Sequence, residues 1–150
     1  MSSGKRLVKK IFVDANTIVS GLLFEGDESL LIRLGMVRLC ELVTSEYVVE
    51  EVKRVLRSNR FNLSEDDVAF LISYLHRCIR VYTSPTSEEI NRNLSRLGDK
   101  KDVHVLVAFE KFECNLLVTG DAELLSRVKR AKRTRQALEL LLKMAPQGKN

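Results

Sequence analysis

The stretch KKIFVDANTIVSGLLF, residues 9–24, reads as a buried strand that passes directly into a helix. Residues 9–13 are short and mostly apolar, as expected for a buried strand. Asp14 follows, and an acid near the start is typical of a helix such as the one expected over residues 14–24. This strand-then-helix unit recurs along the chain and sets its fold class.

The same alternation continues toward the C-terminus. Ser45 is a suitable N-cap for one helix and Ser64 for the next, where Asp67 completes a capping box. Helices are expected over residues 29–37, 46–57, 64–76, 87–96, 101–113 and 135–144, with a short one after Asp121. Strands are expected over 39–44, 78–82 and 115–119, with an edge strand over 127–132. This order predicts an α/β fold, a three-layer α/β/α sandwich with a mostly parallel central sheet.

Length and composition fit one domain. The chain has 150 residues, 45% hydrophobic and 30% charged, so it can bury a core. We expect a single domain over residues 1–150, with a core over about 9–142 and frayed ends that include Pro146. No apolar run approaches the ~20 residues that span a membrane, and the first residues lack signal-peptide features. A cytoplasmic protein without a membrane segment is therefore expected.

Cysteine and histidine do not form metal-ligand patterns. The three cysteines, Cys40, Cys78 and Cys114, are widely spaced and include no CxxC pair. Neither a zinc knuckle nor a disulfide framework is indicated, and buried free thiols are expected. His76 and His104 lie far apart in the chain. A hard cation with oxygen ligands suits this sequence better than zinc.

Two acids stand at the ends of apolar runs. Asp14 ends IFVD and Asp121 ends LLVTGD. In a parallel sheet, sites form beyond the carboxyl ends of the strands, so both acids are expected at one edge. Each can also simply cap the helix that follows it, and neither is decisive alone.

Two further acids fall on apolar helix faces. At ~100° per residue, Glu51 lies beside Val48 and Val55, whereas Glu50 points away. Asp102 shares a face with apolar residues of DVHVLVAFEKF. The alternative for Glu51 is a position at the edge of the stripe, where its carboxylate reaches water or pairs with an arginine.

Two neighbours of Asp102 have separate expectations. Asp99 is expected to cap the helix that carries Asp102, or else to join a metal shell. His104 lies on the opposite side of that helix and is expected to face solvent.

A cluster of four carboxylates indicates a metal site. Two carboxylates ~4 Å apart repel by roughly 4 kcal/mol at an effective dielectric near 20. A bound Mg²⁺ or Mn²⁺ reverses this effect, lowers the pKa of a bound water and neutralises charge on a phosphate oxygen. The pattern therefore suggests hydrolysis of a phosphodiester.

Basic residues gather in two places. The net charge is +5. Lys5, Arg6, Lys9 and Lys10 lie near the N-terminus, and residues 127–135 form a second basic run without an acid. A polyanion such as nucleic acid is the expected partner, and a solvated basic surface is the alternative. Four residues of the second run are the candidates for RNA binding: Lys129, Arg130, Lys132 and Arg133.

Four segments in this order and spacing resemble the PIN-domain family of metal-dependent ribonucleases, which includes the VapC-type toxins. They are FVDANTIVSGLL, TSEYVVEEVKRVL, GDKKDVHVLVAF and LLVTGDAELL. The resemblance covers nearly the whole chain, from about residue 9 to 142. The HVLVAF segment is bulkier than the small-residue stretch that many members carry.

The resemblance implies an acidic quartet that holds the metal and acts in catalysis: Asp14, Glu51, Asp102 and Asp121. Asp99 matches an additional acid of some members, and Asn16 and Thr119 match accompanying polar residues. The family further implies Mg²⁺ or Mn²⁺, cleavage of single-stranded RNA, frequent homodimers and, for a toxin, an antitoxin partner. An RNA-processing role is equally compatible with the motifs.

Other functions remain open at this stage. A phosphatase of the haloacid dehalogenase type requires a second Asp two residues after the first, where this chain has Asn16. A phosphoacceptor receiver domain requires a set of residues that the chain does not provide. A PIN-like module that binds RNA or protein without cleavage is the main alternative.

Overall fold

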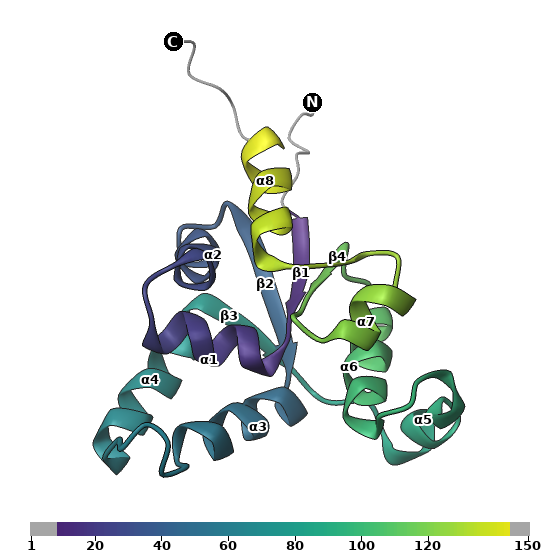
Figure 1. Cartoon of the computed structure of the whole chain (residues 1–150), viewed down its shortest axis with the longest axis horizontal. Helices are drawn as coiled ribbons and strands as arrows, with labels where there is room; N and C mark the ends of the chain where they lie inside the picture. The colour runs from purple at the N-terminus through teal and green to yellow at the C-terminus, as the bar shows by residue number, and fades with distance from the viewer. Residues whose placement is uncertain (1–8, 145–150) are drawn as a thin grey trace.

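The computed structural model describes residues 9–144, and a five-stranded parallel sheet forms its centre (Figure 1). The order of strands across the sheet is β3-β2-β1-β4-β5. The strands are β1 (Lys9–Val13), β2 (Cys40–Ser45), β3 (Ile79–Tyr82), β4 (Leu116–Val118) and β5 (Ala131–Lys132). All four neighbouring pairs are parallel. The expected α/β sandwich with a parallel sheet is therefore confirmed, whereas the expectations for Lys5, Arg6 and Pro146 lie outside the described residues.

Helices cover both faces of this sheet. In Figure 1, α1 to α4 gather on one side of the strands and α5 to α7 on the other. The first group is α1 (Ala15–Leu23), α2 (Asp27–Met36), α3 (Glu46–Leu56) and α4 (Glu65–Cys78). The remaining elements are α5 (Ser87–Asn91), the 3-10 helix η1 (Leu94–Arg96), α6 (Lys100–Lys111), α7 (Ala122–Arg127) and α8 (Thr134–Met144). No helix within residues 9–144 is long and apolar enough to cross a membrane.

Alternating side chains of the strands build the core on the two faces. Phe12 stacks on Phe112, just beyond α6, with ring centroids 6.1 Å apart. Leu42 instead faces α2, where a Cβ on Gly35 would lie 2.5 Å from the Leu42 Cδ1 atom. Glycine is therefore required at position 35, because α2 packs directly onto β2 there.

Local signals fix several helix starts as expected. The Ser45 hydroxyl accepts the Val48 N–H at 3.2 Å and begins α3. Ser64 and Asp67 form the expected capping box at the start of α4. These caps satisfy N–H groups that a helix leaves without partners in its first turn.

Two expected elements differ from the structure. The edge strand expected over 127–132 is limited to Ala131–Lys132, because Arg127 ends α7. The helix expected over 87–96 is divided into α5 and η1. Both segments are short, and β5 lies at the edge of the sheet.

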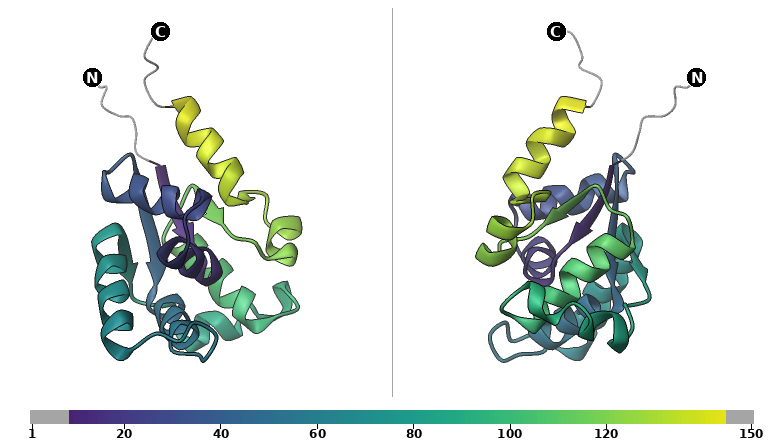
Figure 2. Two further views of the ribbon diagram at one scale, coloured as in Figure 1. Left: turned by 60° about the vertical axis from the view of Figure 1, so that its left-hand side comes forward. Right: turned by 90° about the vertical axis from the view of Figure 1, so that its right-hand side faces the viewer.

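The carboxyl ends of β1, β2 and β4 meet at one edge of the sheet. This edge carries Asp14, Ser45 and Thr119. In Figure 1 and in both views of Figure 2, α3 lies at this end and α8 extends at the opposite end. The predicted acids are therefore expected to lie between the carboxyl edge of the sheet, α3 and α6.

Candidate active site

Asp14 is fixed at the end of β1 by two hydrogen bonds. Its Oδ1 atom accepts the Ala15 N–H at 2.7 Å, so Asp14 caps α1. Its Oδ2 atom accepts the Thr119 hydroxyl at 2.7 Å. Burial raises the pKa of Asp14, the two hydrogen bonds oppose this shift, and the charges of Asp121 and Glu51 raise it further.

Thr119 joins Asp14 to Asp121. The Thr119 hydroxyl, which donates to Asp14, also accepts the Asp121 N–H at 3.0 Å. Asp121 in turn caps α7 by accepting the Leu124 N–H at 3.0 Å. The expected helix caps are therefore present, and the same contacts hold two carboxylates at the same sheet edge.

Asp102 lies in the first turn of α6 and is only 8% exposed. Its pKa is raised to about 7, first by burial, then by the charge of Asp121 and a hydrogen bond with it, and further by Asp99 and Asp14. Removing a carboxylate from water is costly without a compensating charge. Asp102 therefore lies within the field of Asp121, Asp99 and Asp14, which line the same cavity.

Glu51 approaches the cluster from α3, and cations contact both of its oxygens. One oxygen pairs with Arg54 of the same helix, and the other lies 3.6 Å from the Lys101 Nζ atom. The side chain is 22% exposed. The alternative of pairing with an arginine is thus present in the structure, on the same helix face that carries Glu51 to the acids.

These acids line one cavity of about 450 Å³ between the sheet edge, α3 and α6. Its wall contains the whole predicted quartet and Asp99. Asn16, Tyr47 and Lys101 also line it. Sequence reasoning did not select Tyr47 or Lys101, although Tyr47 lies one helical turn before Glu51 and Lys101 directly precedes Asp102.

The negative charge of the cavity wall suits a divalent cation. The carboxylates are, however, not arranged as a set of metal ligands. Within residues 9–144, no three acidic, histidine or cysteine side chains form a ready metal-ligand set. The physical reason is visible in the contacts: Asp14 and Asp121 accept hydrogen bonds, and Glu51 contacts Arg54 and Lys101. A cation would have to draw Glu51 away from these partners.

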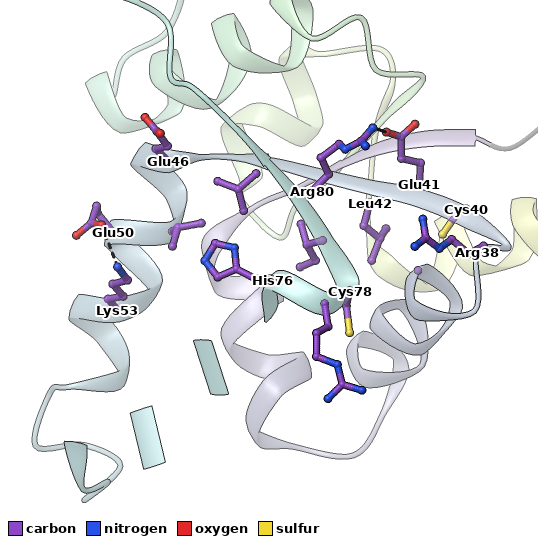
Figure 3. Close-up of a pocket in the computed structure, with 15 residues that line it drawn as sticks. Arg38, Cys40, Glu41, Leu42, Glu46, Glu50, Lys53, His76, Cys78 and Arg80 are labelled. Atoms are coloured by element: carbon purple, nitrogen blue, oxygen red, sulfur yellow. Dashed lines mark hydrogen bonds and ion pairs between the residues drawn. The ribbon is translucent and has the colours of Figure 1, made fainter. Parts of the chain in front are cut away.

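Glu50 and Glu51 point to different sides of α3. Glu50 lines a second, larger cavity of about 830 Å³ beside β2, β3 and α4 (Figure 3). There it pairs with Lys53 at 3.3 Å, and Arg80 pairs with Glu41 at 3.4 Å. The positive charges of Lys53 and Arg80 therefore offset the charges of Glu50 and Glu41 in this second cavity.

The cysteines are buried free thiols, as expected. Cys40 and Cys78 line the larger cavity in Figure 3, and burial raises the pKa of Cys40 to about 12. Burial likewise raises the pKa of Cys114 to about 11. All three remain protonated at neutral pH and are therefore poor metal ligands.

His104 is half-buried, so it faces solvent only in part, and it does not line the acidic cavity. Its ring stacks on Tyr47 with centroids 3.8 Å apart and planes 4° apart. Its Nδ1 atom is buried without a hydrogen-bond partner among the described residues. Helical spacing correctly placed His104 away from Asp102. The Tyr47 ring, which belongs to α3 and covers His104, could not be predicted from the pattern of α6 alone.

The remaining candidates divide into cavity and surface residues. Asp99 caps α6 by accepting the Lys101 N–H at 2.9 Å, and Asn16 is exposed at the cavity wall. None of the four basic candidates lines the cavity. Arg130 donates to the Cys114 carbonyl at 3.0 Å and lies over the Phe109 ring, which ties it to the fold. Lys129 and Arg133 are exposed, and Lys132 is partly buried.

The fold and the acidic edge define a PIN-type α/β domain. A family model described as "PIN domain" matches residues 10–123. The chain therefore belongs to the PIN domain family, whose members are generally nucleases. No curated protein matches the sequence at a significant level.

Two solved structures share the fold. PAE2754 from Pyrobaculum aerophilum is 18% identical with a TM-score of 0.63, covering 93% of this chain and 97% of its own. VapC20 from Mycobacterium tuberculosis, described as a toxin that cleaves the sarcin–ricin loop, is 18% identical with a TM-score of 0.56. That alignment covers 77% of this chain and 93% of VapC20.

Proposed function

We propose that this protein is a Mg²⁺- or Mn²⁺-dependent endoribonuclease that hydrolyses phosphodiester bonds of single-stranded RNA. The observation that carries the proposal is one cavity at the carboxyl edge of a PIN-domain sheet whose wall contains Asp14, Glu51, Asp102 and Asp121. The pKa of Asp102, which burial and the neighbouring acids raise, agrees with it. A cluster that resists ionisation without a counter-charge is suited to bind a divalent cation.

Asp14, Glu51, Asp102 and Asp121 would hold the cation. When bound, it would supply an activated water and neutralise charge on a phosphate oxygen. Asp14 is oriented for this role by the Thr119 hydroxyl, and Asp121 by the first turn of α7. Lys101 would be released from Glu51 to contact the phosphate, since it lines the same cavity.

The proposed function includes a substrate, a location and binding partners. RNA cleavage by VapC20 and the shared fold support an RNA substrate and a role in the cytoplasm, either as a toxin with an antitoxin partner or in RNA processing. A homodimer is proposed from the family alone. The exposed Lys129 and Arg133 would contribute to binding of the RNA backbone, because phosphate contacts supply most non-specific affinity.

A PIN-like module that binds RNA or protein without cleavage is the second candidate. The pairing of Glu51 with Arg54 and Lys101 favours it, because a permanent pairing would disable the metal site. Thermal melting with millimolar Mn²⁺ separates the two. A nuclease is stabilised, by ~2.7 kcal/mol at one hundred times the Kd, whereas an unchanged melting temperature contradicts the proposed function.

A further inference from the structure

We propose that Tyr47 positions the RNA substrate by donating a hydrogen bond from its hydroxyl to a phosphate oxygen that is not cleaved. His104 would hold the Tyr47 ring in place. This inference rests on the proposed ribonuclease function. Tyr47 is the aromatic residue among those that line the acidic cavity.

The position of Tyr47 is fixed from two sides. Its ring lies parallel to that of His104, with centroids 3.8 Å apart. Its backbone N–H donates to the Ser84 hydroxyl at 2.8 Å. Tyr47 is on α3 and His104 on α6, the helices that carry Glu51 and Asp102. The stacked pair therefore connects the two helices that bring these acids to the cavity.

The Tyr47 hydroxyl is available as a donor. It makes no hydrogen bond to any residue within 9–144, in contrast to its backbone N–H. Burial raises the pKa of Tyr47, and the charges of Glu51 and Asp99 raise it further. The hydroxyl therefore stays protonated at neutral pH and lies within the field of two cavity acids.

A phosphate entering this cavity needs such a donor. The wall has five carboxylates and one cation, Lys101, which lies 3.6 Å from Glu51. Beyond the proposed metal ion and Lys101, the side-chain donors of the wall are the Asn16 amide and the Tyr47 hydroxyl. A neutral hydroxyl can bind a phosphate oxygen without competing with the metal ion for the acids. An additional lysine, in contrast, would compete with the metal ion because it would pair with the carboxylates.

A purely structural role would use the ring alone. If Tyr47 served only to separate α3 from α6, Tyr47→Phe would behave as wild type, since phenylalanine preserves the stacking. If the hydroxyl binds substrate, Tyr47→Phe impairs substrate binding while the fold remains intact. The two roles therefore differ in the effect of removing one oxygen atom.

The test is steady-state cleavage of a single-stranded RNA oligonucleotide in Mn²⁺ by wild type and variants. We expect Tyr47→Phe to raise KM about three- to tenfold, because the substrate loses one hydrogen bond. The value of kcat should change by less than about twofold. His104→Phe should retain most of the wild-type KM, whereas His104→Ala should raise it. Tyr74→Phe is the matched control, because it also removes a tyrosine hydroxyl, from a residue of α4 that does not line the acidic cavity.

Each outcome has one meaning. A wild-type KM for Tyr47→Phe, with cleavage intact, overturns the role of the hydroxyl and leaves the nuclease function standing. An equal effect of Tyr74→Phe also overturns it. A wild-type protein that cleaves no RNA in Mn²⁺ contradicts the proposed function and this inference together. Melting temperatures, expected to agree for wild type and Tyr47→Phe, separate lost contacts from lost folding.

Discussion

The Thr119 hydroxyl donates a 2.7 Å hydrogen bond to the Asp14 carboxylate, although the two residues lie 105 positions apart in sequence. This bond joins the ends of β1 and β4, the neighbouring central strands. It counteracts the effect of burial on the pKa of Asp14. Thr119 therefore favours the ionised form of Asp14, while burial keeps the pKa of Asp14 above its ordinary value overall.

Replacing Thr119 with valine tests this relationship. The variant removes the donor to Asp14 and leaves the Asp121 N–H without its 3.0 Å acceptor. We expect the free energy of unfolding to fall by about 1–3 kcal/mol, measured by denaturant titration, and Mn²⁺ affinity to fall as well. Thr44→Val is the matched control, because the buried Thr44 hydroxyl donates to the Val13 carbonyl at 2.9 Å and not to a carboxylate. Equal Mn²⁺ affinity in both variants would contradict the role of Thr119.

The pH dependence of stability reports on Asp102. Its pKa is about 7 in the folded protein, above the ordinary value of 3.8, so the folded state retains a proton that the unfolded chain loses. The contribution of Asp102 to the stability of the metal-free protein is therefore fully present below about pH 4 and is lost as pH rises to about 7, by an amount on the order of 4 kcal/mol. Asp102→Asn should remove this part of the slope and stabilise the metal-free protein at pH 8. An unchanged slope in Asp102→Asn would refute this assignment.

Adjacent glutamates of α3 provide a matched pair. Glu51 lines the acidic cavity, whereas Glu50 lines the larger cavity and pairs with Lys53. We expect Glu51→Gln to lower Mn²⁺ affinity by at least about tenfold and to abolish most cleavage. Glu50→Gln should leave both within about twofold, since a surface ion pair contributes little. Calorimetric titration with Mn²⁺ measures the difference, and similar losses in the two variants would exclude a specific role of Glu51.

Most of the fold was predictable because its signals are local. Short apolar runs and caps such as Ser45 identify the strands and helices, and their alternation leads to the parallel sheet. The placement of Glu51 at the cavity also followed from helical spacing. The ends of short peripheral elements did not, because residues 127–132 carry no strong cap or apolar period.

What could not be predicted depends on contacts between separate elements. The pairing of Glu51 with Lys101 and the stacking of His104 on Tyr47 both join α3 to α6. The residue pattern of one helix predicts the direction of a side chain. It does not predict which residue of another element contacts that side chain. For the same reason, the basic run predicts Arg130 as an RNA contact, whereas the structure shows it donating to the Cys114 carbonyl and lying over the Phe109 ring.

The basic run therefore contains residues of two kinds. Arg130→Ala should lower the free energy of unfolding by about 1–2 kcal/mol, through loss of its hydrogen bond and its contact with Phe109. Lys129→Ala should leave stability unchanged and reduce the salt dependence of RNA binding by about one charge. Melting curves and RNA titrations over a range of salt concentrations measure both effects. A stable Arg130→Ala protein would contradict the structural role of Arg130.

We propose that the acids at the carboxyl edge catalyse metal-dependent RNA cleavage. The most direct measurement compares wild type with Asp14→Asn on single-stranded RNA in Mn²⁺. Asparagine can still cap α1 at Ala15 and removes one charge from a repelling cluster, so the variant should fold. We predict Mn²⁺-dependent cleavage by wild type and none by folded Asp14→Asn, whereas an active Asp14→Asn protein would contradict a catalytic role of these acids.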